Sequence, residues 1–142
     1  MRLLFLTQII PYPPDSGPRI KTWHVLRYLA QNSHRVTLAS YVRPDEEAYV
    51  PALKQVCEQI YTVPMQRSRA RDVYYLLRSF LSGRPFLIER DDLPKMRFLV
   101  NRLLREETFD YALADQLTMT QFLLNGKRGE KPRIIFDAHN AV

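Results

Sequence analysis

The sequence predicts a single α/β domain built on a doubly wound, mostly parallel sheet. Short apolar runs alternate with stretches of helical periodicity along the whole chain. The connections between them are short, which favours parallel strands joined by helices. The length of 142 residues corresponds to about one domain. The 46% hydrophobic and 25% charged residues exclude a disordered or fibrous protein.

The first half of the chain contains two predicted strands around one helix. A nearly uniform apolar run predicts a buried strand over residues 3–7. A proline-rich loop follows, and then a helix over 18–32, with Pro18 at its first position and Ser16 or Asp15 as its cap. Trp23 and Leu26 recur at helical spacing and predict its buried side. The next apolar run predicts a strand over 36–42.

The middle of the chain is predicted to be mostly helical. A helix is expected over 45–57, shortened or kinked by Pro51, and a short strand over 59–64. A second helix is expected over 69–82, with an apolar side that includes Phe80 and Leu81. A Gly-Arg-Pro break at 83–85 separates it from a helix over 92–107, whose basic residues are expected to face outward.

The last part of the chain adds two further strands. They are predicted at 111–115 and 133–139, with a short helix at 116–124 between them. The whole alternation predicts a Rossmann-like topology. Because the pattern calls for another helix after the last strand, we expect the 142 residues to be a truncated domain.

Several function classes lack their sequence motifs. The first loop has neither G-x-G-x-x-G nor a P-loop pattern, and the chain has no HExxH and no nucleophile elbow. We expect no bound metal.

The single cysteine, Cys57, cannot form an internal disulfide, and we expect a buried thiol in a reducing compartment. No apolar run approaches the length of a membrane span, and the first residues read as a strand rather than a signal peptide. We therefore expect a cytoplasmic domain.

The loop after the first strand is the first candidate site. In open parallel sheets, ligands bind beyond the carboxyl ends of the strands. Ser16 and Gly17 lead directly into a helix, whose N-terminus offers free N–H groups and a partial positive charge. Arg19 adds a guanidinium suited to phosphate. The alternative is an ordinary glycine turn beside a solvated arginine.

The end of the last predicted strand is the second candidate site. Asp137, His139 and Asn140 bring three hydrogen-bonding side chains to one carboxyl edge. His139 suits proton transfer or contact with a ligand oxygen. The alternative is a structural histidine held by Asp137. Asp115 follows the fourth strand and is interpreted as a cap of the following helix, with a place facing the cleft as the alternative.

The positive charge is concentrated in one part of the chain. The net charge is +6, and residues 65–105 contain ten basic and four acidic residues, so this segment carries the whole excess. Such a segment attracts phosphate, nucleic acid or an acidic lipid surface. The alternative is a solvated helix surface above an ordinary buried stripe.

Taken together, the first loop and the last strand resemble a known family. The segments PYPPDSGPR, HRVTLASYV, FDYALAD and RIIFDAHN are similar to the N-terminal domain of family-four glycosyltransferases, which have the GT-B fold. The likeness covers essentially all 142 residues and is strongest to bacterial members that act in exopolysaccharide and cell-envelope assembly.

This resemblance implies a retaining transfer from a nucleotide-sugar donor to a glycan or lipid-linked acceptor, without a cofactor or metal. It implies that Gly17 and Arg19 approach the donor diphosphate and that His139 contacts the sugar or the reacting centre. Ser16, Asp137 and Asn140 are carried over as further binding residues. The family's C-terminal donor-binding domain is absent from these 142 residues, so the chain is expected to be the acceptor-side half of the enzyme and inactive alone.

Two further expectations concern partners. The basic segment interleaves arginines with aromatic residues, which suits an anionic membrane surface and peripheral attachment at the inner membrane face. No DNA- or RNA-binding motif accompanies the charge, so nucleic acid is not expected as a partner. The alternative function is a non-catalytic Rossmann-like module that binds a partner or polyanion through residues 65–105.

Overall fold

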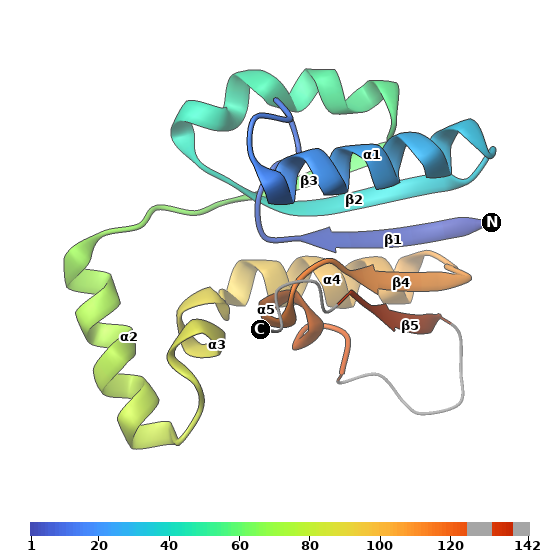
Figure 1. Cartoon of the computed structure of the whole chain (residues 1–142). Helices are drawn as coiled ribbons and strands as arrows, with labels where there is room; N and C mark the ends of the chain where they lie inside the picture. The colour runs from blue at the N-terminus through green and yellow to red at the C-terminus, as the bar shows by residue number, and fades with distance from the viewer. Residues whose placement is uncertain (125–131, 138–142) are drawn as a thin grey trace.

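A computed structural model describes residues 1–124 and 132–137 and contains a five-stranded sheet whose strands are all parallel (Figure 1). The strand order is β3-β2-β1-β4-β5, which is the arrangement of a Rossmann-like doubly wound fold. The predicted fold class is confirmed. The strands are β1 (Arg2–Thr7), β2 (Arg35–Val42), β3 (Gln59–Pro64), β4 (Tyr111–Ala114) and β5 (Arg133–Phe136).

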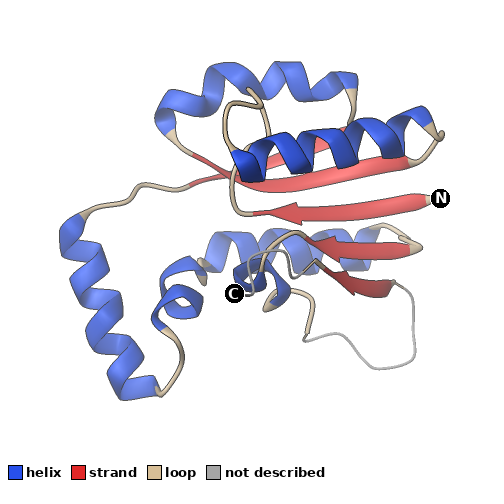
Figure 2. Ribbon diagram, viewed as in Figure 1, coloured by secondary structure: helices blue, strands red, loops and turns tan. Residues whose placement is uncertain are grey.

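The helices connect the strands in the order that the alternation predicts. They are α1 (Gly17–Gln31), the 3-10 helix η1 (Pro44–Gln55), α2 (Arg69–Ser82), α3 (Phe86–Asp91), α4 (Pro94–Glu106) and α5 (Leu117–Thr120). Helices α1 and η1 cover one face of the sheet, and α4 and α5 cover the other (Figure 2).

The core consists of two apolar clusters, one on each face of the sheet. On β1, Leu4 and Leu6 join the cluster under α4 and α5, whereas Leu3 and Phe5 join the cluster under α1 and η1. Side chains of a strand alternate between faces, so a continuous apolar run is what a strand covered on both sides requires. The buried Trp23 and Leu26 of α1 lie in the second cluster, as their spacing predicts.

Cys57 is buried in the second cluster and is not part of a disulfide. Burial raises the pKa of its thiol to about 12, because a thiolate would lose its hydration there. The expectation of a buried thiol is therefore confirmed.

The structure corrects several predicted elements. The expected helix over 45–57 is a 3-10 helix, and it contains Pro51, which has no N–H to donate to an α-helical bond. Residues 86–91, for which the sequence predicts no helix, form α3, and the helix predicted from 92 begins at Pro94. Helix α5 is shorter than expected, and β5 ends at Phe136, with Asp137 outside the strand.

Helix α2 and strand β5 stand out by their exposure. Helix α2 has no buried residue and stands at one end of the molecule, beyond the carboxyl ends of the strands (Figure 1). Strand β5 pairs with β4 and ends the sheet, and all four of its residues are exposed. None of the helices in the described part of the chain combines the length and the hydropathy of a membrane-spanning segment.

Candidate functional site

The carboxyl ends of three neighbouring strands and the first turns of α1 form the candidate site. Leu6, Ala114 and Phe136 lie side by side in the register of β1, β4 and β5. Backbone hydrogen bonds extend this register: the Asp115 N–H donates to Leu6 at 2.9 Å, and the Asp137 N–H donates to Ala114 at 3.0 Å. Both carboxylates therefore stand on the edge where open parallel sheets bind ligands.

Helix α1 begins beside this edge at Gly17. Ser16 is its N-cap residue in extended conformation, but its side chain makes no capping hydrogen bond. A Cβ built on Gly17 would meet no atom within 4 Å. The chain's own packing therefore leaves open space at this helix N-terminus, where backbone N–H groups and the helix dipole favour an anion.

Arg19 is held by two carboxylates. Its guanidinium lies 3.1 Å from Asp15 and also contacts Glu46 of η1. The Arg19 side chain is only 15% exposed and that of Glu46 only 5%. Glu46 also accepts a hydrogen bond from the Arg43 backbone N–H at 3.1 Å. In this arrangement Arg19 ties α1 to η1, and its contact with a diphosphate stays a prediction.

Asp115 does not serve as the helix cap that the sequence suggests. The N-cap of α5 is Gln116, and Asp115 is buried at the edge of the sheet. Its carboxylate accepts a hydrogen bond from Thr22 at 2.5 Å and lies 3.3 Å from the Thr7 hydroxyl. A buried carboxylate is stable only when such partners replace water, and this explains why α1 supplies a hydroxyl here.

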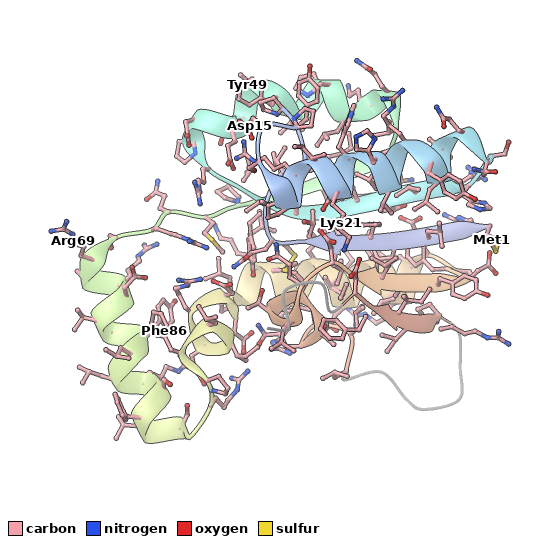
Figure 3. All side chains as sticks on the ribbon, viewed as in Figure 1. Met1, Asp15, Lys21, Tyr49, Arg69 and Phe86 are labelled. Atoms are coloured by element: carbon pink, nitrogen blue, oxygen red, sulfur yellow. The ribbon has the colours of Figure 1, made fainter. Side chains whose placement is uncertain are left out.

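Lys21 is a site residue that sequence reasoning missed. Its ammonium contacts Asp137 and lies 3.9 Å from Asp115, so it connects the two carboxylates of the edge (Lys21 is labelled in Figure 3). The helical period indicates only that Thr22 shares the buried side of the helix with Leu26, four residues later. Lys21 is adjacent to Thr22 and keeps a third of its side chain exposed.

Two of the predicted site residues, His139 and Asn140, lie outside the described residues. Of the predicted set, the structure places Ser16, Gly17, Arg19 and Asp137 at the same end of the sheet, on α1 and after β5. The convergence of Gly17 and His139 on one crevice stays a prediction. The described residues hold no group of three or more metal-ligating side chains.

The expectation that basic residues of 65–105 form an outward face is only partly correct. Four of its arginines pair with three of its own acids. These pairs are Arg78–Glu89, Arg84–Glu89, Arg84–Asp92, Arg90–Asp91 and Arg97–Asp92, all between 2.6 and 3.2 Å. Glu89 and Asp91 are buried, and buried carboxylates require such partners. Much of the positive charge therefore neutralises acids within the segment.

Several arginines gather near the carboxyl ends of β2 and β3. Arg67, Arg71 and Arg90 line a cavity of about 50 Å³ next to the end of β3, and Arg43 and Arg67 line the adjoining open groove of about 550 Å³. The desolvation of Arg67, and then the positive charge of Arg90, lower its pKa. No carboxylate oxygen of residues 1–124 or 132–137 lies within ion-pair distance of Arg43, Arg67 or Arg71.

The comparisons with known proteins show a likeness in fold but identify no family for this chain. No family model matches the sequence, and no characterised protein was found as a relative. The structure is similar to the C-terminal domain of the PF1911 hydrogenase from Pyrococcus furiosus, with a TM-score of 0.59 and 10% identity over 96% of this chain and 90% of that one. This likeness shows the fold alone.

A weaker likeness involves the glycosyltransferase UGT89C1 from Arabidopsis thaliana, whose structure was determined in complex with UDP. Its TM-score is 0.41 with 15% identity, over 86% of this chain but only 30% of the other. At this level the likeness carries no argument about function. The chain is thus a Rossmann-like α/β domain whose polar carboxyl edge is built from β1, β4, β5 and α1.

Proposed function

We propose that the chain is the acceptor-side domain of a retaining glycosyltransferase, which moves a sugar from a nucleotide-sugar donor to a glycan or lipid-linked acceptor. The observation that carries the proposal is the open N-terminus of α1 at Gly17, beside the polar carboxyl edge. The resemblance of the first loop and the last strand to family-four glycosyltransferases supports it. A C-terminal domain that binds the donor completes the enzyme in this proposal.

The proposed chemistry needs a group that stabilises negative charge. Transfer breaks the bond between the anomeric carbon and the diphosphate and forms one to the acceptor hydroxyl oxygen, whose proton passes to the departing diphosphate. Negative charge accumulates on that diphosphate as its bond breaks. The N–H groups and dipole at the start of α1 are preorganised for such charge. Lys21 holds Asp115 and Asp137 in place at the same edge, and in this proposal His139 orients the sugar.

The test is transfer by the longer protein in which this chain is joined to a donor-binding domain, assayed against a panel of nucleotide sugars. Gly17→Ala is the informative variant, because its Cβ meets no protein atom and the fold should not change. We expect kcat/KM to fall roughly tenfold or more, which corresponds to about 1.4 kcal/mol of transition-state stabilisation.

Two controls decide how that result is interpreted. Thermal unfolding of Gly17→Ala should match the unchanged protein, and His139→Ala should lower turnover while leaving the fold intact. Normal transfer by Gly17→Ala would remove the diphosphate role of this loop. Absence of transfer with every nucleotide sugar would contradict the proposed activity itself.

A second candidate function is favoured by Arg43, Arg67 and Arg71, which form no ion pair among the described residues. They line two hollows at the ends of β2 and β3 that share Arg67, together with the acids Asp45, Asp72 and Asp91, and their guanidinium groups suit a phosphate-bearing ligand. Under this alternative the chain is a non-catalytic module that binds a polyanion. Calorimetric titration of the 142-residue chain with tripolyphosphate tests it, with R67Q/R71Q expected to weaken binding and R27Q/R105Q as the matched control.

A further inference from the structure

Strand β3 forms the edge of the sheet that lies opposite β5 (Figure 1). Its inner side pairs in parallel with β2, and directly after it the Met65 N–H donates to the Val42 carbonyl at 2.8 Å. Alternate residues of a strand bond to the same neighbour, so Ile60 and Thr62 direct their backbone N–H and C=O groups away from β2. No hydrogen bond joins these outward groups to any part of residues 1–124 or 132–137. The outer edge of β3 is therefore free to pair with another strand.

An open hollow of about 280 Å³ lies along this free edge. One wall is formed by residues 61–64 of β3, and the other by α4 through Lys95, Phe98, Leu99 and Arg102. Successive residues of a strand point to opposite faces of the sheet, so a hollow that touches all four residues of 61–64 includes the lateral edge of the strand. We call this hollow the β3 groove.

The β3 groove combines an apolar wall with positive charge. Phe98 is 63% exposed beside the buried Leu99, so its ring is available to a ligand. Lys95 and Arg102 are seven residues apart and therefore lie on the same side of α4. Within the described part of the chain, no acidic side chain lines the groove. An acidic ligand with apolar groups fits this lining better than a neutral or basic one.

The two cations of the β3 groove are available for a ligand. The Arg102 guanidinium lies over the Tyr61 ring, 5.9 Å from its centroid, which holds it beside the strand edge. Its nearest acid is Glu106 at 3.9 Å, and the Glu106 side chain is 66% exposed, so solvent screens this pair. Lys95 forms no ion pair with a carboxylate of residues 1–124 or 132–137.

The β3 groove continues at the carboxyl end of the strand into a second hollow of about 660 Å³. The two hollows share Pro64 and Lys95, and the second is bordered by Arg71 and Tyr74 of α2. Its lining among the described residues again contains no acid. An extended ligand along β3 therefore has room to continue past Pro64.

We propose that the β3 groove binds an extended acidic peptide of a partner protein, which adds to the sheet as a further strand next to β3. The peptide backbone exchanges hydrogen bonds with the outward N–H and C=O groups of Ile60 and Thr62, which is how strand addition supplies affinity. Alternate side chains of the peptide point into the groove. There an apolar side chain packs on Phe98, and carboxylates pair with Lys95 and Arg102.

The free edge and the charge together select this occupant. A symmetric pairing of two β3 edges would bring Lys95 and Arg102 of one copy next to those of the other, so a second copy of the chain is disfavoured. A polyanion without a peptide backbone could use the two cations but not the groups of Ile60 and Thr62. The proposal does not depend on glycosyl transfer, because it uses no residue of the polar edge.

The experiment is an NMR titration of the 142-residue chain with the blocked heptapeptide Thr-Glu-Thr-Leu-Thr-Glu-Thr. In an added strand its two glutamates and its leucine point to the same side. We expect saturable binding that high salt weakens, because part of the contact is screened charge. Amide exchange of Ile60 and Thr62 should slow in the complex. The counterpart with lysine in place of both glutamates should not bind.

N-methylated forms of the peptide test strand addition directly. Backbone N–H groups of alternate residues point to the same edge of a strand, so methylating one alternate set blocks the edge that faces β3, and methylating the other set blocks the outer edge. We expect one form to lose binding and the other to bind as the unmodified peptide does. Equal binding of both forms, or loss by both, would contradict pairing with β3.

Thr62→Pro tests the same contact from the side of the protein. It removes an outward N–H and no bond to β2, and an edge strand accepts proline at such a position. We expect the Kd to rise roughly fivefold, as for the loss of one hydrogen bond. Thr62→Val keeps the N–H and should bind as the unchanged chain does. Circular dichroism and the unfolding midpoint of both variants show whether the sheet is intact.

Side-chain variants test the chemistry of the groove. K95Q/R102Q should raise the Kd roughly tenfold at low salt, whereas R27Q/K54Q, which removes the same charge from α1 and η1, should not change it. F98S should raise the Kd roughly fivefold. L117S is its matched control, because Leu117 is similarly exposed, at 64%, but lies on α5.

Four outcomes would overturn the proposal. The first is absence of binding by the acidic heptapeptide, and the second is equal binding of the lysine counterpart. The third is binding that Thr62→Pro and K95Q/R102Q both leave unchanged, which would place the contact elsewhere. The fourth is a dimer in sedimentation equilibrium that F98S converts to monomer and that excludes the peptide, which would identify a second copy as the occupant.

Discussion

At the residue scale, the polar edge depends on one buried carboxylate and its partners. Asp115 receives hydrogen bonds from α1, and Lys21 places its ammonium between Asp115 and Asp137. These contacts tie the start of α1 to β4 and β5, so the open N-terminus at Gly17 is held at a fixed position relative to the sheet. The same side chains therefore stabilise the fold and fix the geometry of the site.

Thr22→Val tests this coupling. Valine keeps the shape of threonine but cannot donate a hydrogen bond, so the buried carboxylate loses a partner. We expect the free energy of unfolding to fall by about 1–3 kcal/mol in urea titration. Thr22→Ser, which keeps the hydroxyl, should lose much less, and equal losses for both variants would show that packing of the methyl group dominates.

The sequence could identify candidate site residues by their chemical type, but not the contacts that they make. It marked Ser16, Gly17, Arg19 and Asp137, and the structure places them at one end of the sheet. It could not predict that Arg19 pairs with Asp15 and Glu46, because Glu46 lies on η1, which a different part of the chain brings next to α1. Lys21 was missed for the same reason, since its partners follow β4 and β5.

At the scale of elements, strands were easier to predict than the nature of each helix. Apolar runs of four to eight residues suffice for buried parallel strands, and β1 to β4 lie within one or two residues of the predicted ranges. Helical spacing also predicted α2 correctly over Arg69–Ser82. The spacing could not show which side of α2 packs against the protein, because contacts with α3 and the flanking turns decide that.

The end of α2 gives a prediction at this scale. Gly83 has a φ of 68° at the C-cap, and a Cβ there would meet no other atom. Gly83→Ala should therefore destabilise the helix end by about 1 kcal/mol through backbone strain alone. Amide hydrogen exchange in α2 measures this, with faster exchange expected near Ser79, and Gly83→Asn should restore part of the protection.

At the scale of the whole molecule, stability resides in the two apolar clusters of the sheet and not in α2. Leu4 is completely buried between β1 and the helices below it, whereas Leu81 is 91% exposed. The fold should accordingly tolerate changes on α2 that it cannot tolerate in the sheet.

The same change, leucine to alanine, at one position in the sheet and one on α2 compares the contribution of the two regions to stability. Leu4→Ala should lower the free energy of unfolding by about 2–5 kcal/mol, because it leaves a cavity in a packed core. Leu81→Ala should change it by less than about 0.5 kcal/mol. Guanidinium titration followed by circular dichroism gives both values, and a large loss for Leu81→Ala would mean that α2 packs against the domain in solution.

Strand β5 has a consequence for how the chain behaves in concentrated solution. It closes the sheet on one side with Ile134, Ile135 and Phe136 uncovered, and no other strand among the described residues bonds to its outer backbone. The outer carbonyl and amide groups of β5, which bond to no strand of residues 1–124 or 132–137, form a template onto which an extended peptide can add. Purified material is accordingly expected to build aggregates by strand addition at this border, and a lysine in place of Ile135 should delay their onset.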